Sequence, residues 1–354
     1  MSRQSTPGLA PSHRALAILK KLSLVVFVTR MLKGDEDKER REKYLGYYDT
    51  FWSGPNVRKE LEAYAKADDD FRYEILQGFI PKPLVGKVTT GYGPPWKRSD
   101  TFFTDFKAHY PSERILHETD KSLIICNHAS HDVRLYKEDI DPTGTDKSPA
   151  AGMSYMHLLV IPVARVYNAV ALEDGDCIEE MREHFKTFWR EPDSKEKIIA
   201  AINETMDRRY KEILTAYDKA EASAETSDAT EGHNNPSEER RKHLEDVMVK
   251  CRQYASQCAD LLRKMDQEYS DYMGFHPHPT TSVGHLHMHV LFMDRPEFRT
   301  NSTSAHDGKT IPARVVLRVI NEKRNASDKN PDTKSRSSFF RRFIAPRSSR
   351  IPAG

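Results

Sequence analysis

Three histidines alternate with apolar residues in the segment GHLHMHVLF, which covers residues 284–292. His285, His287 and His289 belong to a chain with only 15 histidines among 354 residues, so their spacing is a local concentration. An imidazole can bind a metal ion, attack an electrophile or transfer a proton near neutral pH. The segment therefore predicts a chemical site built from neighbouring imidazoles.

The alternation also predicts the structure that carries these histidines. Leu286, Met288 and Val290 occupy the positions between them, which is typical of a half-buried β-strand. One face of such a strand would pack the apolar side chains into the core. The other face would present the histidines in a row, with neighbours roughly 6.5–7 Å apart along the strand.

Three interpretations of this row are open at this point. Two of the histidines could bind zinc, with His276 and His278 as further ligands nearby. One imidazole could instead attack a phosphorus atom while its neighbours orient it or assist the leaving group. The row could also be an inert surface, since clustered titratable groups mark functional sites only statistically.

The loop before the predicted strand favours phosphoryl chemistry. In GFHPHPTTSVGH, Ser282 and Gly284 lie directly ahead of the histidines, and two prolines shape the backbone. Short hydroxyl side chains and free backbone N–H groups in such loops bind phosphate oxygens. An anion-binding loop that leads into a histidine strand suits this reaction better than a metal site alone.

Short apolar runs elsewhere predict the strands that would neighbour the histidine strand. Ile115–Glu118 and Ser122–Cys126 flank the polar turn TDK and predict a β-hairpin. The run MHLLVIP, residues 156–162, ends at a proline and predicts a buried strand. The segment IPARVVLRVINEK, residues 311–323, could form a strand or a short helix.

Residues 176–270 change to helical periodicity. The apolar positions that show it are Ile178, Met181, Phe185, Phe188, Ile199, Ile202, Met206, Tyr210, Ile213 and Tyr217. After a polar linker, NPSE predicts a helix with Asn235 as N-cap and Pro236 as its first residue.

The second of these helices has an apolar seam with alternating spacings of four and three, as at the a and d positions of a coiled coil. The seam consists of Leu244, Met248, Cys251, Ala255, Cys258, Leu262 and Met265. Two such helices predict an α-hairpin, and core packing explains both cysteines without redox or metal chemistry.

The chain is expected to contain four segments. Residues 1–34 have six Lys/Arg and no acidic residue, which indicates a surface helix or a disordered basic start, with a mitochondrial transit peptide as the alternative. Residues 35–111 read as an irregular extension without recognisable chemistry. Residues 112–324 form the main domain around the helical insertion 176–270. Residues 325–354 predict a disordered basic tail, which could solvate the protein or contact nucleic acid or an anionic surface.

The overall composition limits the class of protein. A net charge of +2 and 31% charged residues argue against a globally basic nucleic-acid binder. The four cysteines include no CxxC pair, which fits a reducing compartment and lacks a zinc-finger signature. No apolar run reaches the length of about 18 residues that spans a bilayer. We therefore expect a soluble intracellular protein, cytoplasmic or nuclear, without a transmembrane segment.

The motif HLHMHVL resembles the signature of the histidine-triad (HIT) superfamily, His-x-His-x-His followed by apolar residues. The upstream loop is most similar to Hint-like nucleotide-binding proteins and more distantly to aprataxin and the scavenger decapping enzymes. MHLLVIP is similar to the family's strand that ends in Val-Ile-Pro, and ILHETDKSLIICNHA is similar to its first hairpin. The resemblance covers residues 112–173 and 271–295. It implies an α+β fold with a HIT-like antiparallel β-sheet, flanking helices and, in this chain, a large α-helical insertion.

The resemblance implies a nucleotide hydrolase or transferase that needs no metal and no other cofactor. His287 would attack the α-phosphorus of a phosphoramidate, adenylylated or dinucleotide substrate, and water would then release the nucleoside monophosphate. His289 would contact the phosphate and help the leaving group. His285 and His157, which lies at a family active-site position, would support the imidazole network.

Further positions bear on what the site binds. The resemblance implies that Ser282 and Gly284 bind phosphate. Asn127 aligns with the acidic residue that holds the ribose hydroxyls, and Arg165 stands where the family has a histidine. The expected ligand is a purine nucleoside phosphate, and a homodimer formed by joining sheets is one expected assembly. The alternative function is a nucleotide-binding scaffold that engages partners through the helical insertion.

Overall fold

The computed structural model describes residues 36–66, 103, 106–110, 112–127, 153–224, 236–265, 273–281, 283–292, 296–300 and 303–329. Four of the sequence-based predictions lie outside these residues: the basic segment 1–34, the tail beyond Lys329, the N-cap Asn235 and the phosphate ligand Ser282.

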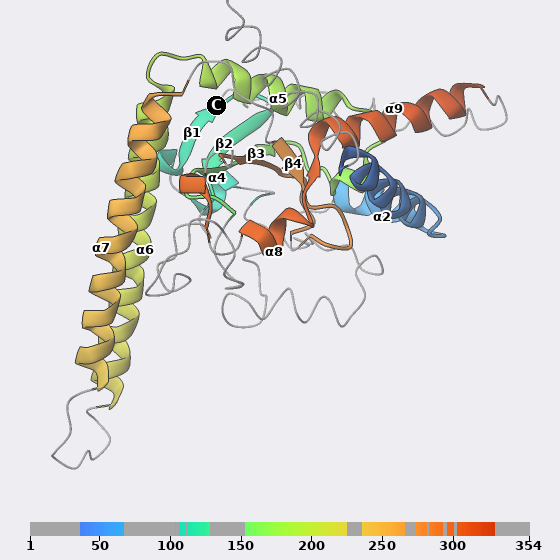
Figure 1. Ribbon diagram of the computed structural model, residues 1–354. Helices are drawn as coiled ribbons and strands as arrows, with labels where there is room; N and C mark the ends of the chain where they lie inside the picture. Colours follow the sequence, from blue (N-terminus) through green and yellow to red (C-terminus); the bar gives the residue numbers. More distant parts are fainter. Residues whose placement is uncertain are drawn as a thin grey trace, which may run out of the picture.

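One antiparallel sheet of six strands forms the centre of the described fold, in the order β1-β2-β3-β5-β4-β6 (Figure 1). The strands are β1 (Ile115–Glu118), β2 (Ser122–Cys126), β3 (His157–Pro162), β4 (Met273–Phe275), β5 (Met288–Leu291) and β6 (Ile311–Pro312). The predicted hairpin is confirmed as β1 and β2, and the apolar run ending at a proline is confirmed as the buried strand β3. Together with its helices, the sheet makes the fold α+β.

The predicted half-buried strand at the histidines is wrong in two respects. The strand β5 starts at Met288, so His285 and His287 precede it. Both faces of the segment are buried, and the exposed fractions of His285, His287 and His289 are 0%, 7% and 6%. The reason is a second apolar layer on the histidine face of the sheet. Its members are Phe103, Phe106, Leu123, Ile125, Leu159 and Ile161.

The helical insertion follows the predicted periodicity. Helix α5 (Asp176–Trp189) packs across β2 and β3, while α6 (Ser194–Ala224) and α7 (Pro236–Arg263) run side by side as a long hairpin (Figure 1). Helix α7 begins at the predicted Pro236. Cys251 and Cys258 are buried in the apolar seam. Burial raises the pKa of each thiol to about 12, so both stay protonated and serve packing.

The described residues 36–66 of the N-terminal extension are mostly helical. Residues 36–52 form a helix, α2 (Val57–Lys66) follows, and aromatic residues of both pack into the main core. Tyr44, Tyr48 and Phe51 recur at helical spacing, as on one face of an amphipathic helix. The many charged residues before and between them made this apolar stripe hard to recognise in the sequence. The hydroxyl of Tyr44 donates a hydrogen bond to the carbonyl of Ala169 at 2.9 Å, which ties the helix to the core.

The segment after the sheet is both strand and helix. Ile311–Pro312 pairs with β4, and α9 (Ala313–Lys329) follows at once. The helix therefore continues to Lys329, past the boundary at residue 325 that the sequence predicts for the tail. Its buried stripe of Val315, Val316 and Val319 explains why it stays helical on the domain.

Short helices complete the described part of the chain. They are α4 (Phe106–His109), α8 (Thr303–Asp307) and the 3-10 turns Ser112–Arg114, Ala169–Ala171 and Pro296–Phe298. Among the helices described, none combines the length and the apolar character needed to cross a membrane.

Candidate functional site

Three of the four predicted histidines meet at the centre of the sheet. His157 begins β3 and His289 lies in the adjacent β5, and the Nε2 atom of His157 is 2.9 Å from Nδ1 of His289. His287 lies just before β5, and its ring centroid is 4.9 Å from that of His289. The antiparallel pairing of β3 with β5 thus brings two distant sequence segments into one cluster.

The backbone carbonyl of His285, two residues earlier, sets the orientation of the His287 ring. Its Nδ1 atom donates a hydrogen bond to the carbonyl oxygen of His285 at 2.8 Å. The Nε2 atom therefore carries the lone pair, and no described residue hydrogen-bonds to it. Burial lowers the pKa of His287 to about 4, so the imidazole is neutral at physiological pH. A neutral imidazole with a free Nε2 lone pair is a nucleophile.

His289 presents a second unused nitrogen. Its Nδ1 atom faces His157, while its buried Nε2 atom has no hydrogen-bond partner among the described residues. Burial, followed by the neighbouring histidines, holds the pKa of His289 well below its ordinary value. A buried polar atom without a partner is costly, so the site is suited to a ligand that supplies one.

His285 has a different environment from the other two members of the motif. Its Nε2 atom donates to the carbonyl of Pro162 at 3.1 Å, and its Nδ1 atom accepts from the hydroxyl of Tyr64 at 3.3 Å. Burial lowers the pKa of His285 to about 3. The ring is used to anchor the backbone that orients His287, and it links the end of β3 to α2.

An apolar wall lies beside the ring of His287. The ring of Phe103 has its centroid 5.1 Å from that of His287, and Phe103 belongs to the second apolar layer on this face of the sheet. Such a wall can pack a planar or apolar group of a ligand next to the reacting atom.

Asn127 contacts the histidine cluster directly. Its side-chain nitrogen lies 3.1 and 3.3 Å from the two ring nitrogens of His157, and its backbone N–H donates to the carbonyl of His157 at 2.8 Å. The residue that the resemblance assigns to the ribose thus lies against the imidazole of His157.

The loop residues are placed in part. Gly284 is buried, and its carbonyl accepts a hydrogen bond from the backbone N–H of Asn168 at 2.9 Å. Arg165 is partly buried, and its Nη1 atom has no hydrogen-bond partner among the described residues.

The cluster includes residues that the sequence did not assign to a reaction. The His276 ring centroid lies 4.2 Å from that of His289, and the ring of His306 stacks on His276 at 5.9 Å with an interplanar angle of 13°. His276 stood out in sequence only as an additional zinc ligand. His306 and Tyr64 had no sequence signal, because they come from segments without any recognisable motif.

The rings of the cluster contact one another in tilted or edge-to-face geometry, except for His276 and His306, which stack. Within the described ranges, no group of three or more His, Cys, Asp or Glu side chains is arranged to hold a metal ion. The Nε2 atoms of His287 and His289 have no hydrogen-bond partner among the described residues, so one ring can accept a hydrogen bond from a ligand and the other can donate one.

None of the family models, curated proteins or solved structures compared with this chain matches it.

Proposed function

We propose that this protein is a nucleotide hydrolase or nucleotidyltransferase of the histidine-triad superfamily, with His287 as its nucleophile. The observation that carries the proposal is the hydrogen bond from Nδ1 of His287 to the His285 carbonyl. It selects the tautomer whose lone pair is on Nε2, and burial keeps this ring unprotonated. The HIT-like motif HLHMHVL and its upstream loop supply the reaction class.

The proposed reaction has two displacement steps. The Nε2 atom of His287 attacks the α-phosphorus, a phosphorus–nitrogen bond forms, and the bond from phosphorus to the amine, phosphate or other leaving group breaks. The leaving group takes up a proton. Water then attacks the phosphorus, the bond to His287 breaks, and a nucleoside monophosphate leaves; an acceptor other than water gives transfer.

His289 is assigned to the phosphate and the leaving group. When His157 donates its Nε2–H to Nδ1 of His289, the proton of His289 resides on its Nε2 atom. This N–H can donate a hydrogen bond to a phosphate oxygen or a proton to the departing atom. The partnerless state of Nε2 in the described structure supports this assignment.

The apolar wall at Phe103 supports a nucleoside as the bound group. A purine presents a flat apolar face that aromatic side chains stack against. A base packed on this layer would place its α-phosphate near His287, because the ring of Phe103 adjoins that of His287. The side-chain nitrogen of Asn127 contacts His157, so a ribose hydroxyl would share the Asn127 amide with that ring.

The test is a substrate panel with an adduct measurement. Purified protein is incubated with adenosine phosphoramidates, adenylylated DNA, a diadenosine polyphosphate and a cap dinucleotide, and monophosphate release is followed. A pre-steady-state sample is quenched in alkali, because phosphorus–imidazole bonds hydrolyse in acid, and the His287 peptide is examined by mass spectrometry. We expect a nucleotidyl adduct on His287 with at least one substrate.

The matched variant is His287→Asn. An asparagine amide can still donate to the His285 carbonyl, so the fold is kept while the nucleophilic atom is removed. His117→Asn is the control, since His117 lies in β1 away from the cluster. Release by the wild type that persists in His287→Asn, or the absence of release from the whole panel, would overturn the proposal.

A second candidate function is a nucleotide-binding scaffold, and the α6–α7 hairpin favours it. The hairpin extends far beyond the sheet (Figure 1). Much of its length therefore does not cover the sheet and is available to another molecule. A variant in which a short linker replaces residues 216–240 tests this role. Tight nucleotide binding with negligible turnover, and a partner complex lost only in the shortened variant, would favour the scaffold over the enzyme.

A further inference from the structure

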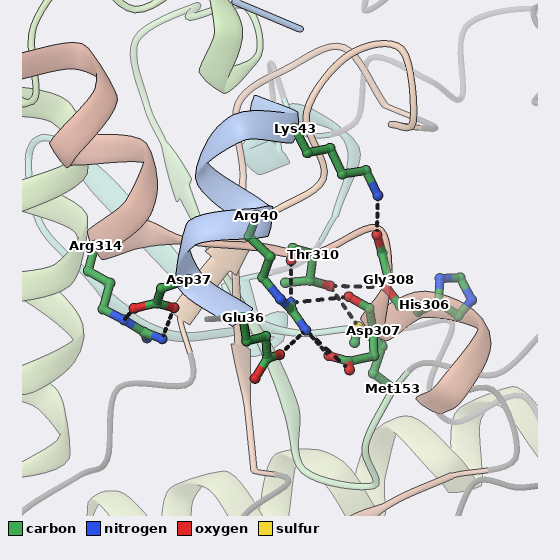
Figure 2. Close-up of polar contacts among 10 residues, drawn as sticks. All are labelled: Glu36, Asp37, Arg40, Lys43, Met153, His306, Asp307, Gly308, Thr310 and Arg314. Carbon is green, nitrogen blue, oxygen red and sulfur yellow. Dashed lines mark hydrogen bonds and ion pairs between the residues drawn. The ribbon is translucent and has the colours of Figure 1, made fainter. Parts of the chain in front are cut away.

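Two basic side chains of the N-terminal helix hold the loop that follows α8 (Figure 2). The Nη1 atom of Arg40 donates to the carbonyl of Thr310 at 2.6 Å and to that of Asp307 at 3.3 Å. The Nη2 atom of Arg40 contacts the carboxylate of Asp307, and Lys43, three residues along the helix, donates to the carbonyl of Gly308. The N-terminal helix, whose sequence shows no recognisable chemistry, thus hydrogen-bonds a loop about 270 residues away in the chain.

These contacts have a physical reason. Helix α8 has five residues, and the last carbonyls of a helix have no partner within it. Cationic donors at a helix C-terminus satisfy such carbonyls and complement the helix dipole. Arg40 is 17% exposed, so its hydrogen bonds are partly shielded from water. The loop 307–310 is therefore held by charge-assisted bonds in one conformation.

The loop positions a hydroxyl against the histidine cluster. The Oγ1 atom of Thr310 lies 3.2 Å from the carbonyl of His306 and 3.4 Å from Sδ of Met153, either of which can accept its proton. It also lies 3.1 Å from Nε2 of His276, from which it accepts when that nitrogen carries the proton. Gly274 permits this approach, because a Cβ atom there would lie 2.6 Å from the Thr310 side chain and 2.9 Å from the Ile311 carbonyl. The ring of His276 in turn packs against the ring of His289, with their centroids 4.2 Å apart.

We propose that Arg40 is a positioning residue of the histidine site. It fixes the carbonyl of Thr310, and the Thr310 hydroxyl then sets the tautomer and orientation of His276 against His289. The kinetic consequence rests on the proposed function, whereas the effect on the His276 ring does not.

Arg41 provides the matched control. It is the next residue of the same helix and forms an ion pair with Glu322 on α9, at 30% exposure, without touching the loop. Arg40→Ala and Arg41→Ala each remove one guanidinium from this helix; Arg40→Ala removes ion pairs with Glu36 and Asp307, and Arg41→Ala removes one with Glu322. Only Arg40→Ala releases the Thr310 carbonyl.

The first arm of the test measures nucleotidyl transfer to His287. Arg40→Ala should slow adduct formation about tenfold with little change in KM, because a small displacement near the reacting groups is costly. Arg40→Lys should recover part of the rate, and Arg41→Ala should stay within about twofold of wild type. Thr310→Val should reproduce the defect, while Thr310→Ser, which keeps the hydroxyl, should not. The double variant Arg40→Ala/Thr310→Val should be no slower than either single variant, as expected for one shared pathway.

The second arm is independent of activity. Protein labelled with ¹⁵N-histidine is compared by NMR, with the His276 ring assigned from His276→Gln. We expect Arg40→Ala and Thr310→Val to move the His276 ring signals, and Arg41→Ala and Thr310→Ser to leave them in place. Arg40→Lys replaces Arg40→Ala if the latter does not fold.

The two arms separate the two proposals. A wild type without transfer activity contradicts the proposed function, and the NMR arm alone then decides the role of Arg40. His276 signals that are the same in wild type, Arg40→Ala and Thr310→Val would overturn the positioning role, even in an active enzyme.

Discussion

His157 and His289 lie 132 residues apart in the chain, yet the Nε2 atom of the first is 2.9 Å from Nδ1 of the second. The contact crosses the pairing of β3 with β5, and the second nitrogen of His289 is buried without a hydrogen-bond partner among the described residues. A strand pair thus determines which atom of a catalytic candidate is available.

Removal of His157 should lower activity more than it lowers stability. In His157→Ala, the Nδ1 atom of His289 loses its partner and the ring is free to rotate. We expect a loss of about 10²-fold in the rate of adduct formation. The free energy of unfolding should fall by about 1–3 kcal/mol, which is typical when a buried polar atom loses its partner. Stopped-flow kinetics and urea titration measure the two effects, and unchanged adduct formation would show that the hydrogen bond between His157 and His289 does not support the reaction.

The pH dependence of adduct formation should report the lowered pKa of His287. Because burial lowers this pKa to about 4, the nucleophile is already unprotonated at pH 7 and stays so at pH 5.5. The pre-steady-state rate should therefore be flat through the ordinary histidine range and fall only as the pH approaches about 4. A rate that halves near pH 6.5 would show that the nucleophile has an ordinary pKa.

Protein stability should decrease in acid before the carboxylates titrate. Burial lowers the pKa of five histidines to about 3 or 4, namely His184, His278, His285, His287 and His306. In the unfolded chain these groups titrate near about 6.5. Below about pH 6.5 the unfolded state binds protons that the folded state does not bind. The free energy of unfolding is therefore highest above that pH and decreases as the pH falls toward about 4.

The measurement is urea unfolding at closely spaced pH values. The free energy of unfolding should change little between pH 7 and pH 8 and should fall steeply between pH 6 and pH 5. The slope in that window counts the protons taken up on unfolding, and a value above two is expected because five histidines have a lowered pKa in the folded state. An unchanged free energy from pH 7 to pH 5 would show that these rings are protonated in the folded state.

The close approach of the loop to β4 predicts opposite effects for two glycine substitutions. In Gly274→Ala, the new Cβ would meet Thr310 at 2.6 Å and backbone at 2.9 Å, so we expect a loss of about 1–3 kcal/mol. Gly46 lies in the helix of residues 36–52 with nothing within 4 Å of its Cβ position. Gly46→Ala should therefore raise stability by about 0.5–1 kcal/mol. Thermal unfolding of both variants checks the pair, and equal shifts would contradict the packing argument.

Local patterns in the sequence determined the elements of this fold. The bounds of β1 and β2, the run that contains β3, the start of α7 at Pro236 and the buried cysteine seam follow from short apolar runs, helical periodicity and proline placement. These signals are local because side-chain direction repeats along a strand or helix. The same alternation grouped His285, His287 and His289 and made His157 and the histidine segment candidates for one site.

Tertiary structure alone decided how that site is built. The second apolar layer, which includes Phe103, buries the histidine face of the sheet, so a row of histidines expected at the surface lies in the interior. Tyr64 reaches His285 and Arg40 reaches Thr310 across separations of 221 and 270 residues. No periodicity encodes such contacts, because they depend on which surfaces pack when the whole core closes. The chain sequence supplied the imidazoles, and long-range packing determined their tautomers, their neutrality and the nitrogen atoms left open.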